Sequence, residues 1–322
     1  MPKEVELKLV VLPEVLESNL PSLLKALNVD KVEESWLANT YFDTPGFSLN
    51  QHKVALRIRK KGGRYIQTLK TKGESVAGVH QRGEWEWEVE RNKLVPSLLE
   101  ECVWPNGVSV DALTPVFETN FKRISSFIER DGTKIELAID IGRIVSGGKK
   151  ERLCEIELEI IEGDVGRLFD VASVIARSFP VMLSDVSKAE RGYRLSNEGV
   201  AGCFSYQYDC AGSYEGYVKG LVVRNLSYWL FLFDRVAFSR DKALLSEMRD
   251  ALVVLQELVV SCKFVDASKE FSHEGLFAAE IARIGEVLGD AGVGNDEIFD
   301  TLLSSRDGGV LAIELGRWLH AF

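Results

Sequence analysis

The first two-thirds of the chain alternates polar and apolar residues with a period of two, the pattern of strands buried on one face. Turn residues such as Gly62-Gly63, Asp131-Gly132 and Gly147-Gly148 separate the alternating segments. These segments are residues 3–11, 54–61, 64–72, 83–91, 133–144 and 153–161. Two stretches with helical spacing, residues 13–27 and 164–177, interrupt them. The pattern predicts an antiparallel sheet with flanking helices.

From residue 214 the apolar positions instead recur every three to four residues, as they do in amphipathic helices. Helices are predicted over residues 221–236, 241–262, 274–288, 295–305 and 311–321. The Gly- and Ser-rich residues 199–213 are predicted to be a linker. The expected fold is therefore α+β, with a first domain over residues 1–198 and a smaller all-α domain over residues 214–322.

The polar faces of the predicted strands are almost purely charged. Residues two apart on a strand share a face, so Glu4, Glu6 and Lys8 lie opposite Val5 and Leu7. The charges also segregate by strand, with Arg57, Arg59, Lys70 and Lys72 on some and Glu136, Asp140, Glu155 and Glu157 on others. The simpler alternative is a sheet whose charged face meets water. We expect instead that the strands curl into a lumen, in which divalent cations and a polyanion neutralise the two walls.

Composition and charge narrow the class of protein. The 322 residues carry 39 basic and 49 acidic side chains, and the net charge of −10 argues against nucleic-acid binding. No signal peptide and no run of about 18 apolar residues is found, so we expect no membrane partner. Five cysteines without a CxxC pair fit the reduced thiols of a cytoplasmic protein. The four histidines match no zinc spacing, so carboxylates would have to hold any metal.

A series of motifs resembles the CYTH, or triphosphate tunnel metalloenzyme, superfamily over about residues 1–197. The motifs are Glu4-x-Glu6-x-Lys8, Y41-F-D-T-P45, L56-R-I-R59, T68-L-K70, R82-G-E84, F117-E-T-N-F-K-R123, E136-L-A-I-D140, C154-E-I-E-L-E159 and S187-K-A-E-R-G-Y193. The resemblance implies an eight-stranded antiparallel β-barrel that forms a tunnel, with triphosphate and divalent metal bound inside.

The resemblance also assigns roles within the tunnel. The implied metal ligands are Glu4, Glu6, Asp140, Glu155 and Glu157. The implied triphosphate-binding residues are Lys8, Arg57, Arg59, Lys70, Lys72, Arg82, Arg123 and Lys188. Glu84, Glu136 and Glu159 are further lumen carboxylates, and Lys8, Glu6, Arg59 and Lys188 are the candidate catalytic residues. Lys8, flanked by cations, is either a base with a lowered pKa or simply a phosphate ligand.

The activity that the resemblance favours is hydrolysis of inorganic triphosphate to pyrophosphate and phosphate with Mg²⁺ or Mn²⁺, two ions per site. The predicted tunnel positions are charged, no aromatic side chain is expected to face inward for base stacking, and Trp85 and Trp87 point away from the charged wall. A class IV-type adenylate cyclase, a nucleoside or thiamine triphosphatase, and a non-catalytic polyphosphate-binding module remain the alternatives.

Residues 244–264 resemble a degenerate helix of a CHAD domain. Ser246 stands where the resemblance implies a histidine, and Arg249 is the remaining basic residue of the motif. Residues 200–322 carry a net charge of −7, against −3 for residues 1–199, which argues against polyanion binding by this part. We expect a shortened helical bundle that packs on the tunnel, shields it or forms a homodimer.

Overall fold

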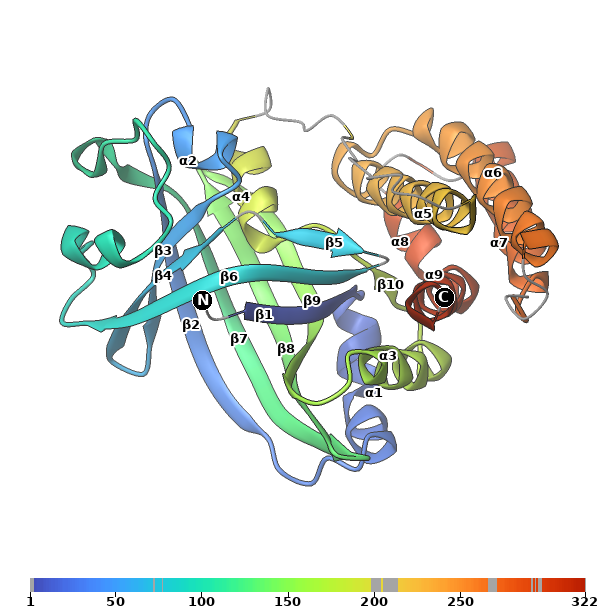
Figure 1. Cartoon of the computed structure of the whole chain (residues 1–322), viewed down its shortest axis with the longest axis horizontal. Coiled ribbons are helices and arrows are strands. Elements are labelled where there is room, and N and C mark those ends of the chain that lie inside the picture. The colour runs from blue at the N-terminus through green and yellow to red at the C-terminus, as the bar shows by residue number, and fades with distance from the viewer. Residues whose placement is uncertain are drawn as a thin grey trace.

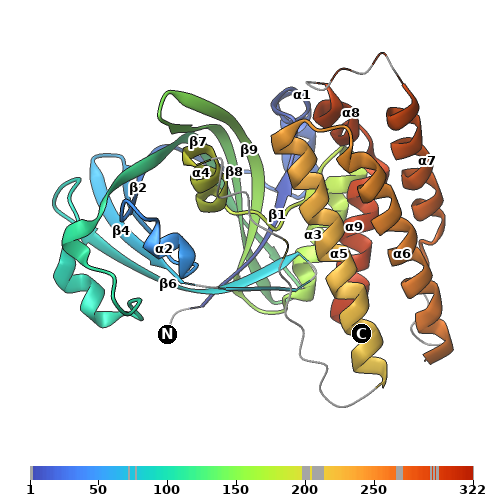
Figure 2. The same ribbon diagram turned by 90° about the horizontal axis from the view of Figure 1, so that it is seen from above.

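The computed structural model describes residues 3–71, 73–76, 78–197, 204, 214–265, 271–290, 292, 294 and 297–321. A β-barrel lies on one side of the molecule and a group of helices lies on the other (Figures 1 and 2). Lys72 and the predicted linker, apart from residue 204, lie outside the described residues.

Eight antiparallel strands close the barrel. They are β1 (Lys3–Val10), β2 (Glu33–Asp43), β3 (Ala55–Lys61), β4 (Arg64–Lys70), β6 (Val79–Val89), β7 (Thr114–Arg130), β8 (Thr133–Ser146) and β9 (Lys149–Glu162). Their order around the barrel is β1-β9-β8-β7-β2-β3-β4-β6, and β6 pairs back with β1. The short strands β5 (Glu74–Val76) and β10 (Met182–Leu183) extend this sheet on β6 and β1. The predicted eight-stranded antiparallel barrel is confirmed.

Apolar side chains on the outer face of the barrel form its core. Leu7, Ile156 and Leu158 are fully buried and pack with Phe169 of α3 (Gly166–Ser178) and Leu16 of α1 (Pro13–Ala26). A second cluster on the outer face joins Leu56 and Leu69 to Leu49 of α2 (Ser48–Gln51) and to Leu99 of the 3-10 helix Pro96–Glu101. Trp85 and Trp87 pack against this second cluster and away from the charged wall, as predicted.

Strands β2 and β7 were not among the predicted strands, because their pattern is reversed. Leu37 of β2 and Phe121 of β7 are buried and pair with each other, whereas the outward Trp36 is 71% exposed. In register, Tyr41 lies opposite Arg57 and Phe117, so its ring is on the charged, inner face. The expectation that no aromatic residue faces inward is therefore wrong.

Helix α4 (Lys188–Ser196) was also not predicted. It contacts β7, β8 and β9 and lies at one end of the barrel (Figure 2). A Cβ atom at Gly192 would come within 2.1 Å of the Phe117 ring, so glycine is required for this close approach. Ser187 and Glu190 form a reciprocal capping box that fixes the start of the helix.

The described residues of the C-terminal part form helices joined by turns and short irregular segments. Its helices are α5 (Tyr214–Ser239), α6 (Leu244–Val265), α7 (Gly275–Gly289), α8 (Ile298–Leu303) and α9 (Arg306–Ala321). Helices α5 and α9 begin seven and five residues before their predicted starts, α8 is shorter than predicted, and α6 and α7 lie within three residues of the predicted bounds. Among the described residues, no helix has the length and apolar character that crossing a lipid bilayer requires.

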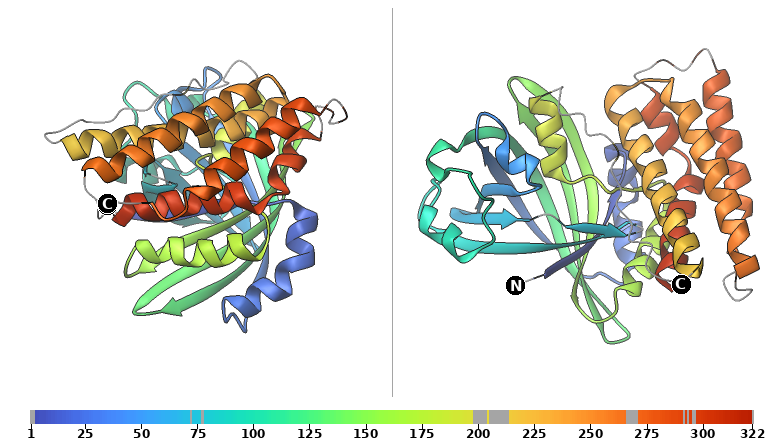
Figure 3. Two further views of the ribbon diagram at one scale, coloured as in Figure 1. Left: turned by 90° about the vertical axis from the view of Figure 1, so that its right-hand side faces the viewer. Right: turned by 45° about the horizontal axis from the view of Figure 1, so that its top comes forward.

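The helical part packs on the barrel through α3. Helix α9 contacts α3 and β10, and one hydrophobic cluster continues from Leu7 of the barrel through Phe169 to Leu315 of α9 and Trp229 of α5. Figure 3 shows these helices covering one side of the barrel. The division into two domains at residues 198 and 214 stays a prediction.

Candidate active site

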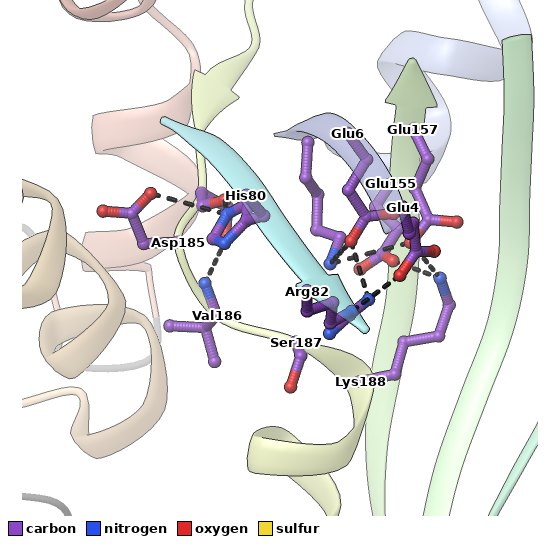
Figure 4. Close-up of polar contacts among 12 residues, drawn as sticks. Glu4, Glu6, His80, Arg82, Glu155, Glu157, Asp185, Val186, Ser187 and Lys188 are labelled. Carbon is purple, nitrogen blue, oxygen red and sulfur yellow. Dashed lines mark hydrogen bonds and ion pairs between the residues drawn. The ribbon is translucent and has the colours of Figure 1, made fainter. Parts of the chain in front are cut away.

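The charged residues of β1 face the lumen and are almost completely buried. Glu4, Glu6 and Lys8 are 7%, 3% and 2% exposed. The register places Glu4 opposite Arg82 on β6, and Lys8 opposite Glu157 on β9. Figure 4 shows side chains from β1, β6, β9 and α4 pointing toward one another in a common space.

A first cluster forms around Glu4. Arg82 donates from Nε to Glu4 and from Nη2 to Glu6, over 2.7 Å and 2.8 Å. The Nζ of Lys70 donates to the other oxygen of Glu4 over 2.7 Å and lies 3.1 Å from Glu84. Burial alone would raise the pKa of Glu4, but the charges of Lys70 and Arg82 hold it well below its usual range. Both β1 carboxylates are therefore ionised and paired.

A second cluster gathers the acidic residues of β8 and β9. Ligand oxygens of Asp140, Glu155 and Glu157 all lie within 4.8 Å of one another. The Nζ of Lys188, delivered by α4, lies 2.7 Å from Asp140 and 2.9 Å from Glu157, and it also bonds Glu155. Arg123 bonds Asp140 and Glu157 over 2.6 Å each. Together with Lys8, the cluster therefore contains three cations and three carboxylates in mutual contact.

This second cluster fits a divalent cation. Its donors are carboxylate oxygens, which are the ligands that Mg²⁺ and Mn²⁺ prefer. Oε2 of Glu155 is buried and accepts no hydrogen bond from the described residues, so it has a lone pair to give. These three acidic residues can hold a metal ion.

Lys8 connects the two clusters. Its Nζ lies 3.7 Å from Glu6 and 3.6 Å from Glu157. Burial would lower the pKa of Lys8, but the surrounding Glu6, Glu155 and Glu157 raise it above its ordinary value. Because carboxylates are the nearer neighbours of Lys8, the geometry favours the alternative in which Lys8 is a phosphate ligand over the one in which it is a base with a lowered pKa.

A third group lies toward β2 and β3. Arg57 approaches Glu84 and Glu86 at 3.9 Å and 3.8 Å and donates to the hydroxyl of Tyr41. Arg59 donates to Oδ1 of Asn39 over 2.8 Å, and within the described part of the chain it has no carboxylate within 4 Å. Burial and the charges of Arg57 and Arg123 lower the pKa of Arg59 to about 10. Arg59 is thus a half-buried cation that has no carboxylate within 4 Å in the described part of the chain.

The remaining predicted carboxylates, Glu136 and Glu159, lie on the neighbouring strands β8 and β9. Glu136 pairs in register with Glu159, which in turn lies opposite Glu6. Burial and the charge of Glu4 raise the pKa of Glu159 to about 8. The structure therefore brings every predicted site residue except Lys72, which is not described, to the inner face of one barrel.

Sequence reasoning missed several residues that contact the site. Asn39 accepts a hydrogen bond from Arg59, and the hydroxyl of Tyr41 accepts one from Arg57. The ammonium of Lys188 lies over the ring of Phe121, 5.2 Å from its centroid, in a cation–π contact. Arg191 lies 3.5 Å from Glu155. Tyr41, Phe121 and Arg191 lie within the motifs given above, but their partners become visible only from strand register and from the packing of α4.

The fold and the site together define a closed antiparallel β-barrel whose lumen carries interleaved carboxylate and cationic clusters. The sequence model of the CYTH domain matches residues 2–193, and the chain belongs to the CYTH domain family.

Two curated relatives match parts of the chain. It is 33% identical over 199 residues to the inorganic triphosphatase of Haemophilus influenzae, which covers 62% of this chain and 56% of that protein. It is 44% identical over 52 residues to the putative triphosphatase YjbK of Bacillus subtilis, which covers 16% of this chain and 26% of that protein. The chain thus spans just over half the length of the first of these relatives.

Solved structures are also similar. A putative adenylyl cyclase from Hippeastrum with a dominant triphosphatase activity aligns with a TM-score of 0.46 and 22% identity, over 59% of this chain and 95% of that chain.

Proposed function

We propose that the protein hydrolyses inorganic triphosphate to pyrophosphate and phosphate with the help of divalent metal ions. The observation that carries the proposal is the charge arrangement of the lumen, where clusters of carboxylates and cations largely neutralise each other and Arg59 has no carboxylate within 4 Å among the described residues. A divalent cation together with a polyphosphate can replace these internal pairs without leaving any charge unmatched. The 33% identity to an inorganic triphosphatase supports the same substrate.

The carboxylates would hold the metal. Asp140, Glu155 and Glu157 form the first candidate site, and Glu4 and Glu6 offer ligands for a second ion. A bound Mg²⁺ or Mn²⁺ would supply Lewis-acid stabilisation of the negative charge on the phosphate oxygens.

The cations would hold the substrate. Lys188 and Arg123 are held beside the carboxylate triad, and Arg59 has a charge free for an incoming phosphate. In the reaction the oxygen of water bonds to the terminal phosphorus, the bridging P–O bond breaks, and the bridging oxygen leaves with pyrophosphate. Arg and Lys side chains would stabilise the charge on this leaving group. Lys8 stays an ammonium and serves as a phosphate ligand, given its raised pKa.

The inward aromatic residues do not favour a nucleotide. Tyr41 stacks on Phe117 at 4.5 Å, and Phe117 packs edge-on against Tyr193 at 5.1 Å. All three are at most 3% exposed, so their faces are used in packing and are not open to a base. A tunnel with charged walls and occupied aromatic faces suits a substrate that carries charge along its whole length.

The test is phosphate release from triphosphate, ATP, thiamine triphosphate and pyrophosphate with Mg²⁺ or Mn²⁺, with cyclic AMP measured in the ATP reaction. We expect triphosphate to give the highest kcat/KM, and EDTA to abolish release. Release that is unchanged by EDTA would contradict the metal assignment, and cyclic AMP as the main product from ATP would favour a cyclase. Cytoplasmic location and a homodimer formed through the helices stay predictions.

A further inference from the structure

A chain of partly buried ion pairs leads from the carboxylates of the candidate metal site to the helical part. Arg191 of α4 donates from Nε to Glu151 over 2.7 Å, and its Nη1 lies 3.5 Å from Oε2 of Glu155. Arg194, one turn later on α4, forms a two-point ion pair with Asp234 of α5 and lies 3.9 Å from Glu151. Glu151 thus sits between two arginines.

The elements explain why these groups meet. Glu151 and Glu155 are four residues apart on β9 and share its inner face. Arg191 and Arg194 are three residues apart on α4 and share one side of the helix. Asp234 reaches them from α5, where Phe238, one turn further on, packs its ring 4.2 Å from the guanidinium of Arg194. No sequence motif of the barrel includes Asp234.

We propose that Asp234 of the helical part is a positioning residue for the metal site, acting through Arg194, Glu151 and Arg191 on Glu155. Because Asp234 neutralises Arg194, Glu151 can keep its hydrogen bond with Arg191. Held by Glu151, Arg191 stays 3.5 Å from Oε2 of Glu155 as an ion pair and forms no hydrogen bond with it, so that this oxygen keeps a lone pair for a metal. This inference rests on the proposed metal-dependent function and gives the helical part a role in it.

Loss of the Asp234 charge has a defined consequence. Arg194 would then have Glu151 as its nearest carboxylate, and Glu151 would be drawn from Arg191 toward Arg194. Arg191 would turn to Glu155 and form a full hydrogen bond with the oxygen that a metal needs. Residues behind metal ligands typically change metal affinity by about 10- to 100-fold when mutated, and a residue one step further back should have a smaller effect.

The experiment measures Mn²⁺ affinity without substrate, from the electron paramagnetic resonance signal of free Mn²⁺, together with kcat and KM for triphosphate. For Asp234→Asn we expect about fivefold weaker Mn²⁺ binding and a lower kcat, with KM for triphosphate nearly unchanged. Asp234→Glu should restore both values. The double variant R194M/D234N should also restore them, because no unpaired arginine then competes for Glu151.

Glu314→Gln is the matched control. Glu314 of α9 is another buried carboxylate of the helical part, and it bonds Ser173 and Arg177 of α3 on the outside of the barrel. This variant should lose stability as Asp234→Asn does, but keep its Mn²⁺ affinity and kcat. If Asp234→Asn does not fold, Glu151→Gln breaks the same chain inside the barrel and should weaken Mn²⁺ binding similarly.

The outcomes separate this inference from the proposed function. If Asp234→Asn or Glu151→Gln loses stability but binds Mn²⁺ as the wild type does, the inference is overturned. A double variant as impaired as Asp234→Asn would overturn it as well. If the wild-type protein does not hydrolyse triphosphate, the proposed function fails while the Mn²⁺ affinities still decide this inference.

Discussion

The substitution Glu157→Gln tests the centre of the lumen. Glu157 accepts hydrogen bonds from Arg123 over 2.6 Å and from Lys188 over 2.9 Å, and Lys8 lies 3.6 Å away. The three cations around it are balanced by Glu157, Asp140 and Glu155, so neutralising one carboxylate leaves an excess positive charge in a buried cluster.

The expected magnitudes follow from this geometry. Removing one partner of a buried ion pair costs about 3–5 kcal/mol. The amide oxygen can still accept one hydrogen bond and two carboxylates remain beside Lys188, so we expect a free energy of unfolding lower by about 2 kcal/mol. Loss of one anionic metal ligand should raise the activation barrier by about 3 kcal/mol, which is about a 100-fold loss of kcat.

The assay is phosphate release from triphosphate at saturating Mg²⁺, with urea unfolding of the same preparations. Glu162→Gln is the control on the same strand, since Glu162 is exposed and should change neither quantity by more than about 0.5 kcal/mol. A Glu157→Gln variant with wild-type kcat and an unchanged Mg²⁺ requirement would refute the assignment of this carboxylate to the metal.

Three further predictions follow from single contacts. Arg59→Gln should raise the free energy of unfolding, because burial and the Arg57 charge make the Arg59 cation unfavourable and lower its pKa. The same variant should raise KM for triphosphate at least about tenfold. A destabilised variant with a normal KM would contradict this. Ser187→Ala removes the side-chain cap of α4 and should lower the free energy of unfolding, measured in urea, by about 1 kcal/mol. It should also reduce kcat, because α4 carries Lys188. Unaltered stability and kcat would show that the cap does not support the site. Burial raises the pKa of Asp185 despite its contact with His80, so the folded protein binds a proton at Asp185 more tightly than the unfolded chain does. The stability of the wild type should therefore fall relative to that of Asp185→Asn as pH rises above 3.8. Parallel pH profiles of the unfolding free energies of the two proteins would disprove this prediction.

Six of the eight barrel strands could be predicted from local alternation. Strands β1, β3, β4, β6, β8 and β9 place apolar residues outward under helices and charged residues inward, so a period of two is plain in each. Strands β2 and β7 carry inward Leu37 and Phe121, and the outward Trp36 of β2 is exposed, which reverses the expected pattern there. Helix α4 has nine mostly polar residues, and its Ser187–Glu190 capping box was the local signal available for it.

The sequence by itself determined which charged side chains line the lumen, because strand parity and the family motifs are local properties. Only the tertiary structure decided which charges pair. Arg82 reaches Glu4 across 78 residues because β6 closes on β1, and Lys188 reaches the acidic triad because α4 covers the barrel end. The direction of the Lys8 pKa and the contact of Asp234 with Arg194 depend on distances between such remote elements, since Coulomb energies follow separation in space and not along the chain.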